Sequence, residues 1–249
     1  MSEQFSRTSA ILGDEAMVRL QQARVAVFGV GGVGGYVVEA LVRSGVGTVD
    51  VFDKDDVSIT NLNRQIIALH STVGQDKVSV IAQRMRDINP GVVIHEHKMF
   101  YLPENADDID LTQYDFVVDA VDTVAAKIEL AVRCEQANIP LIAAMGAGNK
   151  LDPSKLQISD IYKTTVCPLA RAMRTTLRKK GVKRLTVAYS TEEPVRPVGD
   201  RLAAEAIDSE DQSPAGSRRK DVPGSAAFVP SAMGLLIASH VVRKIAFGQ

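Results

Sequence analysis

Short apolar runs recur along the first 150 residues, and stretches with helical spacing of apolar positions separate them. Runs of four or five apolar residues, many of them β-branched, are typical of buried parallel strands. The pattern predicts strands at residues 25–28, 49–52, 92–95, 116–120 and 141–145. Because strand and helix alternate, we predict parallel βαβ units, and hence an α/β fold with helices on both faces of a mostly parallel sheet.

Apolar residues at three- and four-residue steps predict the helices between these strands. Val33, Val37 and Leu41 form the buried face of a helix that begins inside a glycine-rich turn and ends near Gly45. Further helices are predicted at residues 75–89 and from about 123 to 138. A short helix at residues 14–22 precedes the first strand, with Met17, Val18 and Leu20 as its apolar contacts.

After residue 151 the pattern changes, and we divide the chain there into a nucleotide-binding half, 1–150, and an extension, 151–249, of one domain. Leu156 and Ile158 alternate with polar residues, as in an antiparallel strand. A helix at 168–180 and a strand at 185–189 follow. Residues 191–223 are polar and rich in proline, which predicts a functional or mobile segment. A helix after Pro230 ends the pattern; polar residues interrupt the apolar stretch 226–247, which favours a core helix over a membrane span.

Composition adds little beyond the general class of protein. The chain has 249 residues, a formal net charge of −1, 45% hydrophobic and 24% charged residues, as ordinary soluble proteins do. The two cysteines, Cys134 and Cys167, do not form a disulfide framework, which favours a reducing cytoplasm. The N-terminal residues have no basic region followed by an apolar stretch, so we expect no signal peptide.

The glycine-rich turn is the first sign of chemistry. Gly29, Gly31, Gly32 and Gly34 directly follow the first strand, where glycine permits a tight turn and close approach to a phosphate. The N-terminus of the next helix attracts an anion. Asp53, at the end of the second strand, is placed to bind ribose hydroxyls. The spacing predicts nucleotide binding, and it fits a nicotinamide or flavin cofactor as well as ATP.

The polar segment after Asp53, DKDDVSITNLNRQ, favours an enzyme that breaks a phosphoanhydride. Asp55, Asn61 and Arg64 lie in it, and Lys77 opens the following helix. An arginine presents a planar set of donors that suits a phosphate, and cations stabilise charge that grows on phosphate oxygens. A dehydrogenase needs no arginine here. Taken singly, each of these residues is also explained as a solvated loop residue.

Together, G-x-G-G-x-G, D-x-D-x-V-x-x-x-N-L-x-R-Q and the later lysine resemble the ubiquitin-activating-enzyme-like superfamily (ThiF, MoeB and HesA). The resemblance implies a Rossmann-like ATP-binding fold, with a partly antiparallel C-terminal extension, that adenylates a carboxylate. By position, Asp53 would bind ribose. The nucleotide-binding residues would be Gly29, Gly31, Gly32, Asp53, Asp55, Asn61, Arg64, Lys77 and Asp122.

The same resemblance implies a metal and a second subunit. Asp122, in DAVDT, matches the aspartate that holds magnesium; from the residues alone, a cap for the next helix is the alternative. Arg7, in FSRT, matches an arginine that reaches the nucleotide of the partner subunit. We therefore expect a homodimer in which Arg7, Arg64, Lys77 and Asp122 are catalytic.

A basic cluster in the extension indicates a polyanionic partner. Between Asp160 and Glu192 the sequence has no acidic residue, but it has Lys163, Arg171, Arg174, Arg178, Lys179, Lys180, Lys183 and Arg184. The three arginines of 171–178 share a helical face, which suits nucleic acid or is simply solvated. A second cluster is Arg218, Arg219 and Lys220.

The extension also separates branches of the superfamily. The C-x-x-C pairs that hold zinc in many sulfur-carrier-adenylating relatives are absent, and KLDPSKLQISDIYKTTVCPLARAMR resembles the branch that cyclises threonylcarbamoyladenosine in tRNA. We therefore expect tRNA, not DNA, as partner, with a sulfur-transfer protein as a possible second one. The alternatives are adenylation of a ubiquitin-like sulfur carrier, an NAD-dependent oxidoreductase and a catalytically idle nucleotide sensor.

Cysteine and histidine contribute no separate site. Cys167, at the start of the basic helix, could be a reactive thiolate, but a buried thiol is the simpler interpretation. Cys134 is expected in the core. The four histidines have no metal-like spacing, and surface placement explains them.

Overall fold

A computed structural model of the chain describes residues 3–196 and 223–248. Of the polar segment 191–223, only its two ends therefore fall within the described residues. The second basic cluster, Arg218, Arg219 and Lys220, lies outside them.

The described residues form one seven-stranded sheet in the order β3-β2-β1-β4-β5-β7-β6. All neighbouring strands in it are parallel except β6 and β7, which are antiparallel. The strands are β1 (Arg24–Phe28), β2 (Thr48–Phe52), β3 (Val93–His97), β4 (Phe116–Asp119), β5 (Leu141–Ala144), β6 (Leu156–Asp160) and β7 (Thr186–Ser190). The predicted mostly parallel α/β sheet with an antiparallel extension is confirmed, and the extension supplies two strands of the same sheet.

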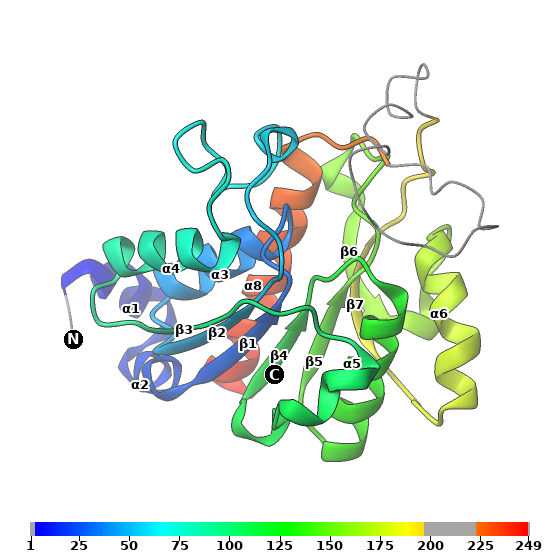
Figure 1. Cartoon of the computed structure of the whole chain (residues 1–249). Coiled ribbons are helices and arrows are strands. Elements are labelled where there is room, and N and C mark those ends of the chain that lie inside the picture. The colour runs from blue at the N-terminus through cyan, green and yellow to red at the C-terminus, as the bar shows by residue number, and fades with distance from the viewer. Residues whose placement is uncertain (1–2, 197–222, 249) are drawn as a thin grey trace.

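Helices cover both faces of this sheet (Figure 1). The α-helices are α1 (Ser6–Leu12), α2 (Asp14–Gln22), α3 (Gly34–Arg43), α4 (Lys77–Ile88), α5 (Val124–Ala137), α6 (Pro168–Lys179) and α8 (Phe228–Phe247). Short 3-10 helices are Glu3–Phe5, Ile59–Asn61, Pro103–Asp108, Leu111–Gln113, Pro153–Lys155 and Ile161–Lys163. Helices α3, α4 and α8 pack on one face, and α5 and α6 pack on the other.

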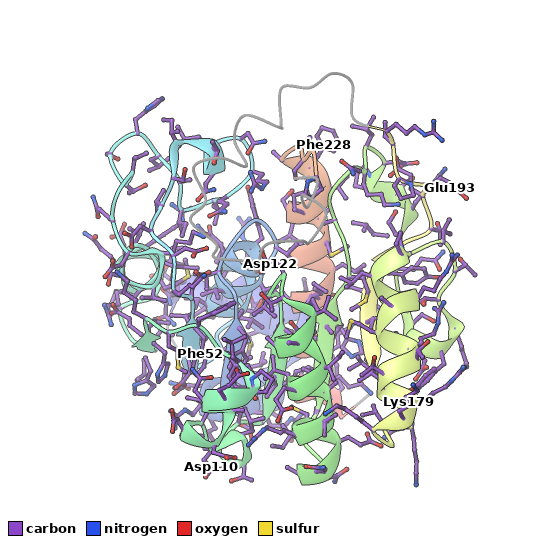
Figure 2. The ribbon with its side chains drawn as sticks, turned by 45° about the vertical axis from the view of Figure 1, so that its right-hand side comes forward. Phe52, Asp110, Asp122, Lys179, Glu193 and Phe228 are labelled. Atoms are coloured by element: carbon purple, nitrogen blue, oxygen red, sulfur yellow. The ribbon has the colours of Figure 1, made fainter. Side chains whose placement is uncertain are left out.

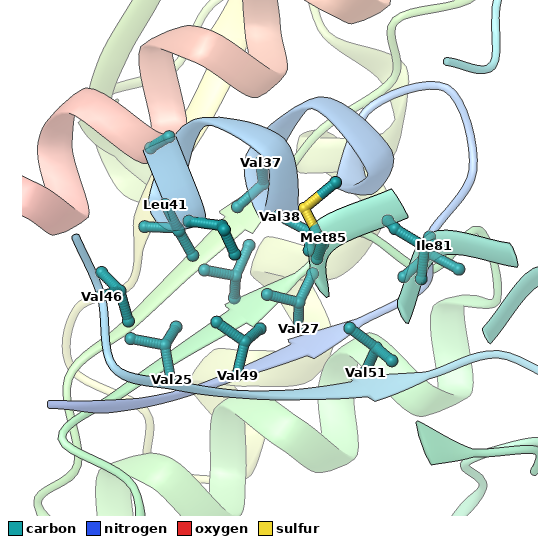
Figure 3. Close-up of a cluster of buried hydrophobic side chains, with 14 of the residues drawn as sticks. Val25, Val27, Val37, Val38, Leu41, Val46, Val49, Val51, Ile81 and Met85 are labelled. Atoms are coloured by element: carbon teal, nitrogen blue, oxygen red, sulfur yellow. The ribbon is translucent and has the colours of Figure 1, made fainter. Parts of the chain in front are cut away.

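The strands are buried on both faces, which explains their continuous apolar runs. Val25 and Val27 of β1 face α3 and α4, together with Val49 and Val51 of β2 (Figure 3). Phe28 points to the other face, where it packs with residues of α5. Because β1 and β2 lie in the middle of this core, the turns at their carboxyl ends have a rigid base.

Two local expectations differ from the structure. Val18 is 49% exposed, because α2 buries only Ala16, Met17 and Leu20 on its inner face. The last helix starts at Phe228 and not after Pro230, since proline is tolerated in the first turn of a helix.

Helix α8 is long and apolar enough, by length and composition alone, to cross a membrane. In this structure it lies along the sheet and packs on α2 and α3. Gly234 makes the closest approach: a Cβ there would lie 2.5 Å from the carbonyl oxygen of Val33. Met233, Ile237 and Val241 are fully buried, as in the core helix that the sequence favours.

Candidate active site

The glycine turn between β1 and α3 combines tight packing with one open position. Gly29 has a φ of +85°, and a Cβ there would lie 2.7 Å from the carbonyl oxygen of Ala120. A Cβ on Gly34 would overlap the carbonyl oxygen of Gly29 at 1.8 Å. At Gly31 a Cβ would meet only the Gln65 amide, at 3.7 Å. The turn can therefore close against β4, while its backbone at Gly31 stays accessible to a ligand.

Helix α3 starts in this turn, and no side chain of the described residues caps its N-terminus. The first N–H groups of a helix have no partner inside the helix and carry a partial positive charge. A Cβ on Gly32 would lie 3.4 Å from the side chains of Arg64 and Pro230, so these two residues flank the turn. An uncapped helix end beside an arginine fits a phosphate group.

Asp53 fixes the glycine turn to the end of β2. One carboxylate oxygen accepts the backbone N–H of Val30 at 2.9 Å, and the other accepts that of Asp55 at 3.0 Å. The side chain is only 10% exposed. Because each carboxylate oxygen has two lone pairs, both atoms retain the capacity to accept a ribose hydroxyl.

Lys77 brings a buried cation to the same edge. It is the first residue of α4, and its Nζ donates to Asp55 at 3.0 Å and lies 3.9 Å from Asp53. The backbone N–H of Lys77 also donates to the carbonyl oxygen of Asp55, at 3.1 Å. Two contacts with Asp55 thus place the Lys77 ammonium beside Asp53, the residue predicted to bind ribose.

The loop 58–65 carries Asn61 and Arg64 beside the glycine turn. Asn61 is buried, and its Oδ1 accepts the backbone N–H of Ser58 at 3.1 Å, which closes the loop. Arg64 donates through Nη1 to the carbonyl oxygen of Thr60 at 2.9 Å and to Oδ1 of Asn63 at 2.8 Å. The guanidinium is therefore supported by its own loop while its stem lies over Gly32.

Asp122 lies at the carboxyl end of β4, the neighbour of β1 (Figure 2). The N–H of Ala120 donates to the carbonyl oxygen of Phe28 at 2.8 Å, which joins this turn to the start of the glycine turn. The Asp122 side chain is exposed and accepts from Oγ1 of Thr123 at 3.3 Å. Thr123, not Asp122, holds the N-cap position of α5, and no side chain of the described residues forms a cap bond there, so the helix-cap alternative is wrong.

These residues fit a magnesium-bound nucleotide. The described part of the chain, 3–196 and 223–248, has no group of three His, Cys, Asp or Glu that could hold a metal. Magnesium in nucleotide sites does not require such a group, since it is bound by one or two carboxylates together with phosphate oxygens and water. One exposed carboxylate, at Asp122, in a turn whose Ala120 packs on the glycine turn, suits that pattern. The roles assigned to these residues stay predictions.

Arg7 does not join this group within one chain. It is exposed on α1, and Phe5, two residues before it, packs near Gly45 at the far end of α3 from the glycine turn. Gln4 contacts Asn89, beyond the far end of α4. Any contact of Arg7 with a nucleotide therefore requires a second chain.

The basic helix α6 splits into an inward and an outward set. Arg174 donates through Nη1 to the carbonyl oxygens of Ile161 and Thr164, at 3.3 and 3.0 Å, and to Oγ1 of Thr164. All three arginines lie on α6 as predicted, but Arg174 is held by backbone and hydroxyl oxygens of residues 161 and 164 and so has a structural role. Arg178 is exposed, with its guanidinium 5.1 Å from the centre of the Tyr162 ring. The other exposed cations of this region are Lys163, Arg171, Lys179, Lys180, Lys183 and Arg184.

Both cysteines are free and buried, as expected. Burial raises the pKa of the Cys134 thiol to about 12. His97 departs from the expected surface placement: it is partly buried, stacks on Phe52 and contacts a carboxylate oxygen of Asp50 at 3.0 Å. Aromatic stacking on the strand before it, not solvent, accounts for this histidine.

A buried ion pair next to Asp122 was not predicted from the sequence. Asp119, the last residue of β4, and Lys127, in the first turn of α5, are 0% and 1% exposed. Nζ of Lys127 lies 3.0 Å from Oδ1 of Asp119. A lysine at an inward position of an otherwise apolar helix face was the available signal, since lysine is almost never buried without a partner.

Comparisons with known proteins found relatives that match nearly the whole chain. Residues 3–247 match the model of the ThiF family. A tRNA threonylcarbamoyladenosine dehydratase of Bacillus subtilis is 45% identical over 246 residues, which is 98% of this chain and 95% of that protein. The enzyme of the same name from Escherichia coli is 34% identical over 98% of this chain and 93% of its own length.

Solved structures of the Escherichia coli enzyme, TcdA, are similar over nearly the whole chain. Its complex with AMP has a TM-score of 0.85 and 33% identity, and it covers 98% of this chain and 94% of TcdA. Its complex with ATP has a TM-score of 0.83 and 32% identity, over 98% and 93% of the two chains.

Proposed function

The chain belongs to the ThiF family, and from this premise we propose that it dehydrates threonylcarbamoyladenosine in tRNA by adenylating its carboxylate with ATP. Near relatives that match over nearly their full length are named for this reaction, and a similar structure holds ATP. The observation that carries the proposal is the open, uncapped start of α3 with Arg64 over Gly32. Phosphoryl chemistry needs this combination, and hydride transfer does not.

Two bond changes make up the reaction. A carboxylate oxygen of the threonylcarbamoyl group attacks the α-phosphorus of ATP, and the bond to pyrophosphate breaks. The carbamoyl group of the same side chain then attacks the acyl carbon, a ring closes, a proton leaves, and AMP departs with the former carboxylate oxygen. Because the second attack is intramolecular, proximity replaces an enzyme nucleophile, and the buried Cys167 has no step to perform.

The residues at the carboxyl edge of the sheet have different roles in the proposed reaction. The uncapped N–H groups of α3 bind a phosphate, and Asp53 orients the ribose. Arg64 and Lys77 offset the charge that grows on the phosphates as pyrophosphate leaves. Asp122 would hold magnesium, which when bound neutralises phosphate charge and aligns the triphosphate.

Arg7 enters only through a second chain, because α1 lies away from the glycine turn of its own chain. We therefore propose a symmetric homodimer in which Arg7 of each chain reaches the other nucleotide. A two-fold dimer satisfies this requirement twice with one interface.

The exposed cations around α6 supply the surface for tRNA. Phosphate contacts from lysine and arginine provide most of the sequence-independent affinity for nucleic acid. With Arg174 directed inward, the proposed surface consists of Arg178 and its exposed neighbours. The two unpaired cysteines suit a protein that works in the cytoplasm with its tRNA.

Mass analysis of tRNA nucleosides tests the proposal. The protein is incubated with ATP, Mg²⁺ and tRNA that carries threonylcarbamoyladenosine. We expect a product lighter by one water, with one AMP and one pyrophosphate formed per modified nucleoside. Turnover only with a ubiquitin-like carrier protein would favour the sulfur-carrier alternative, and tight NADH binding without ATP binding would overturn adenylation.

A further inference from the structure

A buried junction supports the turn that carries Asp122. Oδ1 of Asp119 accepts the backbone N–H of Val121 at 3.2 Å and the ammonium of Lys127 at 3.0 Å. The same ammonium donates to the carbonyl oxygen of Ala144 at 2.7 Å. One lysine therefore joins the ends of β4 and β5 to the first turn of α5.

The turn 120–123 depends on this junction for its position. Asp122 is exposed, and its contact with the hydroxyl of the neighbouring Thr123 does not tie it to the rest of the site. On one side, the N–H of Ala120 is bonded to Phe28, and the carbonyl oxygen of Ala120 lies over Gly29. On the other side, the Asp119–Lys127 pair fixes the residues that flank the turn.

The Asp119–Lys127 ion pair is not an efficient way to stabilise the fold. Removing two charges from water costs several kcal/mol per ion in proteins, and apolar replacement of such a pair is often neutral or stabilising. Oδ2 of Asp119 is buried with no hydrogen-bond partner among the described residues, which adds a further cost. Burial, opposed by Lys127 and the N–H of Val121, raises the pKa of Asp119. An incompletely satisfied buried charge calls for an explanation, and a function that constrains the geometry is one.

We infer that Asp119 and Lys127 are positioning residues, which hold the turn 120–123 so that Asp122 faces the phosphates bound at the glycine turn. The inference rests on the proposed adenylation. Because both side chains are buried, we expect the pair to act only through the position of Asp122. Partners that orient a metal ligand typically change metal affinity or activity by about 10- to 100-fold when they are replaced.

The test uses the full-length double variant Asp119→Asn/Lys127→Met. Asparagine keeps an acceptor for the Val121 N–H, and methionine keeps the length of lysine, so both charges leave without an unpaired ion remaining. Lys127→Met alone would leave a buried carboxylate unpaired, and its failure to fold would decide nothing. The control is Glu39→Gln/Arg84→Met, which removes the ion pair between α3 and α4 at 2.7 Å.

Three readouts separate positioning from support of the fold. Calorimetric titration with ATP, with and without Mg²⁺, gives the factor by which Mg²⁺ raises ATP affinity. In the double variant we expect this factor to fall by about tenfold or more, and we expect the same of Asp122→Ala. The ATP affinity of the double variant without Mg²⁺ and its Tm should match those of the parent protein. AMP formation falls in parallel through kcat, and the control variant changes none of these.

Each result decides the inference. A double variant that keeps the Mg²⁺ factor and kcat within about twofold of the parent would overturn it. So would loss of ATP affinity without Mg²⁺ together with a lowered Tm, since that pattern marks general damage to the fold. If the parent protein binds ATP with Mg²⁺ but forms no cyclised nucleoside, the proposed substrate is wrong, and the binding data still decide the role of the pair.

Discussion

Two carboxylates with no exposed surface, Asp50 in β2 and Asp119 at the end of β4, are held in opposite ways. Asp50 accepts two hydrogen bonds from Arg24, both at 2.8 Å, contacts His97 at 3.0 Å and accepts from the Tyr114 hydroxyl at 3.3 Å. Asp119 has one satisfied oxygen and one without a partner in the described part of the chain.

The difference follows the location of each residue in the sheet. Asp50 is in the middle of a strand, where a full set of partners stabilises one packing arrangement. Asp119 is the last residue of its strand, at the edge where ligands bind in open parallel sheets. For these two carboxylates, the full set of partners belongs to the one inside a strand, and the incomplete set belongs to the one at the edge where the nucleotide is proposed to bind.

The largest expected effect is that of Asp122→Ala. We expect AMP formation to fall by about a thousandfold, since a bound metal contributes several kcal/mol to charge stabilisation. The free energy of unfolding should change by less than about 0.5 kcal/mol, because the side chain is exposed. A coupled pyrophosphate assay and urea unfolding measure the two quantities.

The control for this variant is Asp108→Ala, which removes an exposed carboxylate of the 3-10 helix Pro103–Asp108 that is not among the proposed site residues. It should leave both quantities unchanged. If Asp122→Ala kept full activity, the edge of the sheet next to Asp119 would have no role in AMP formation. The contrast between Asp50 and Asp119 would then have no functional meaning.

The second prediction concerns Asp50→Ala. Its loss leaves Arg24, His97 and Tyr114 without their shared acceptor, and breaking a buried pair costs about 3 kcal/mol of unfolding free energy. ATP affinity of the folded protein should stay within about twofold, because in the described part of the chain the Asp50 side chain bonds to Arg24, His97 and Tyr114, none of them a proposed nucleotide-binding residue. Urea unfolding and titration with ATP check this; a stable variant with weakened ATP binding would reverse the assignment.

The same contrast recurs within α6, with a smaller effect. Arg174→Ala should lower the free energy of unfolding by about 1.5 kcal/mol, because the carbonyl oxygen of Thr164 loses its charged donor. Arg178→Ala should leave stability within about 0.5 kcal/mol but weaken tRNA binding and reduce the slope of log K against log salt by about one. Filter binding at several salt concentrations separates the two; equal effects on tRNA would make both arginines part of one surface.

The smallest expected effect is in the pH dependence. Burial tends to raise the pKa of Asp50, but hydrogen bonds from Arg24 and His97 hold it below its usual range. The stabilisation from Asp50 is therefore present above the unfolded pKa of about 3.9 and is lost as pH falls through the folded value. For Asp119, whose pKa is raised, the sign is opposite: its contribution is present below about 3.9 and is lost as pH rises through the folded value.

Urea midpoints between pH 3 and 8 for the parent, Asp50→Asn and Asp119→Asn/Lys127→Met measure these slopes. A pKa that differs by one between the folded and the unfolded chain corresponds to about 1.4 kcal/mol of unfolding free energy. Each variant lacks one of the two carboxyl groups, so its slope is compared with that of the parent. Changes of slope with the same sign in both variants would contradict the comparison.

The sequence predicted the strands, the helices and the residues of the carboxyl edge, because apolar periodicity and glycine spacing are local signals. Asp53, Arg64 and Lys77 could be named from motif spacing alone, and they lie at one edge since parallel strands end together. The inward turn of Arg174 and the Asp119–Lys127 pair could not be named, because both depend on contacts between distant segments. The prediction for Val18 failed for a related reason: only the tertiary fold decides which side of a short helix is covered.

Helix α8 places a late part of the chain against an early one. Gly234 lies on the carbonyl oxygen of Val33, and Pro230 flanks Gly32, so the base of the proposed nucleotide site includes residues about two hundred positions downstream of the glycine turn. During synthesis on the ribosome, the amino-terminal strands therefore emerge long before the site can take its final shape. A nascent chain arrested before residue 228 should fail to retain ATP, so that no partial product of translation consumes nucleotide.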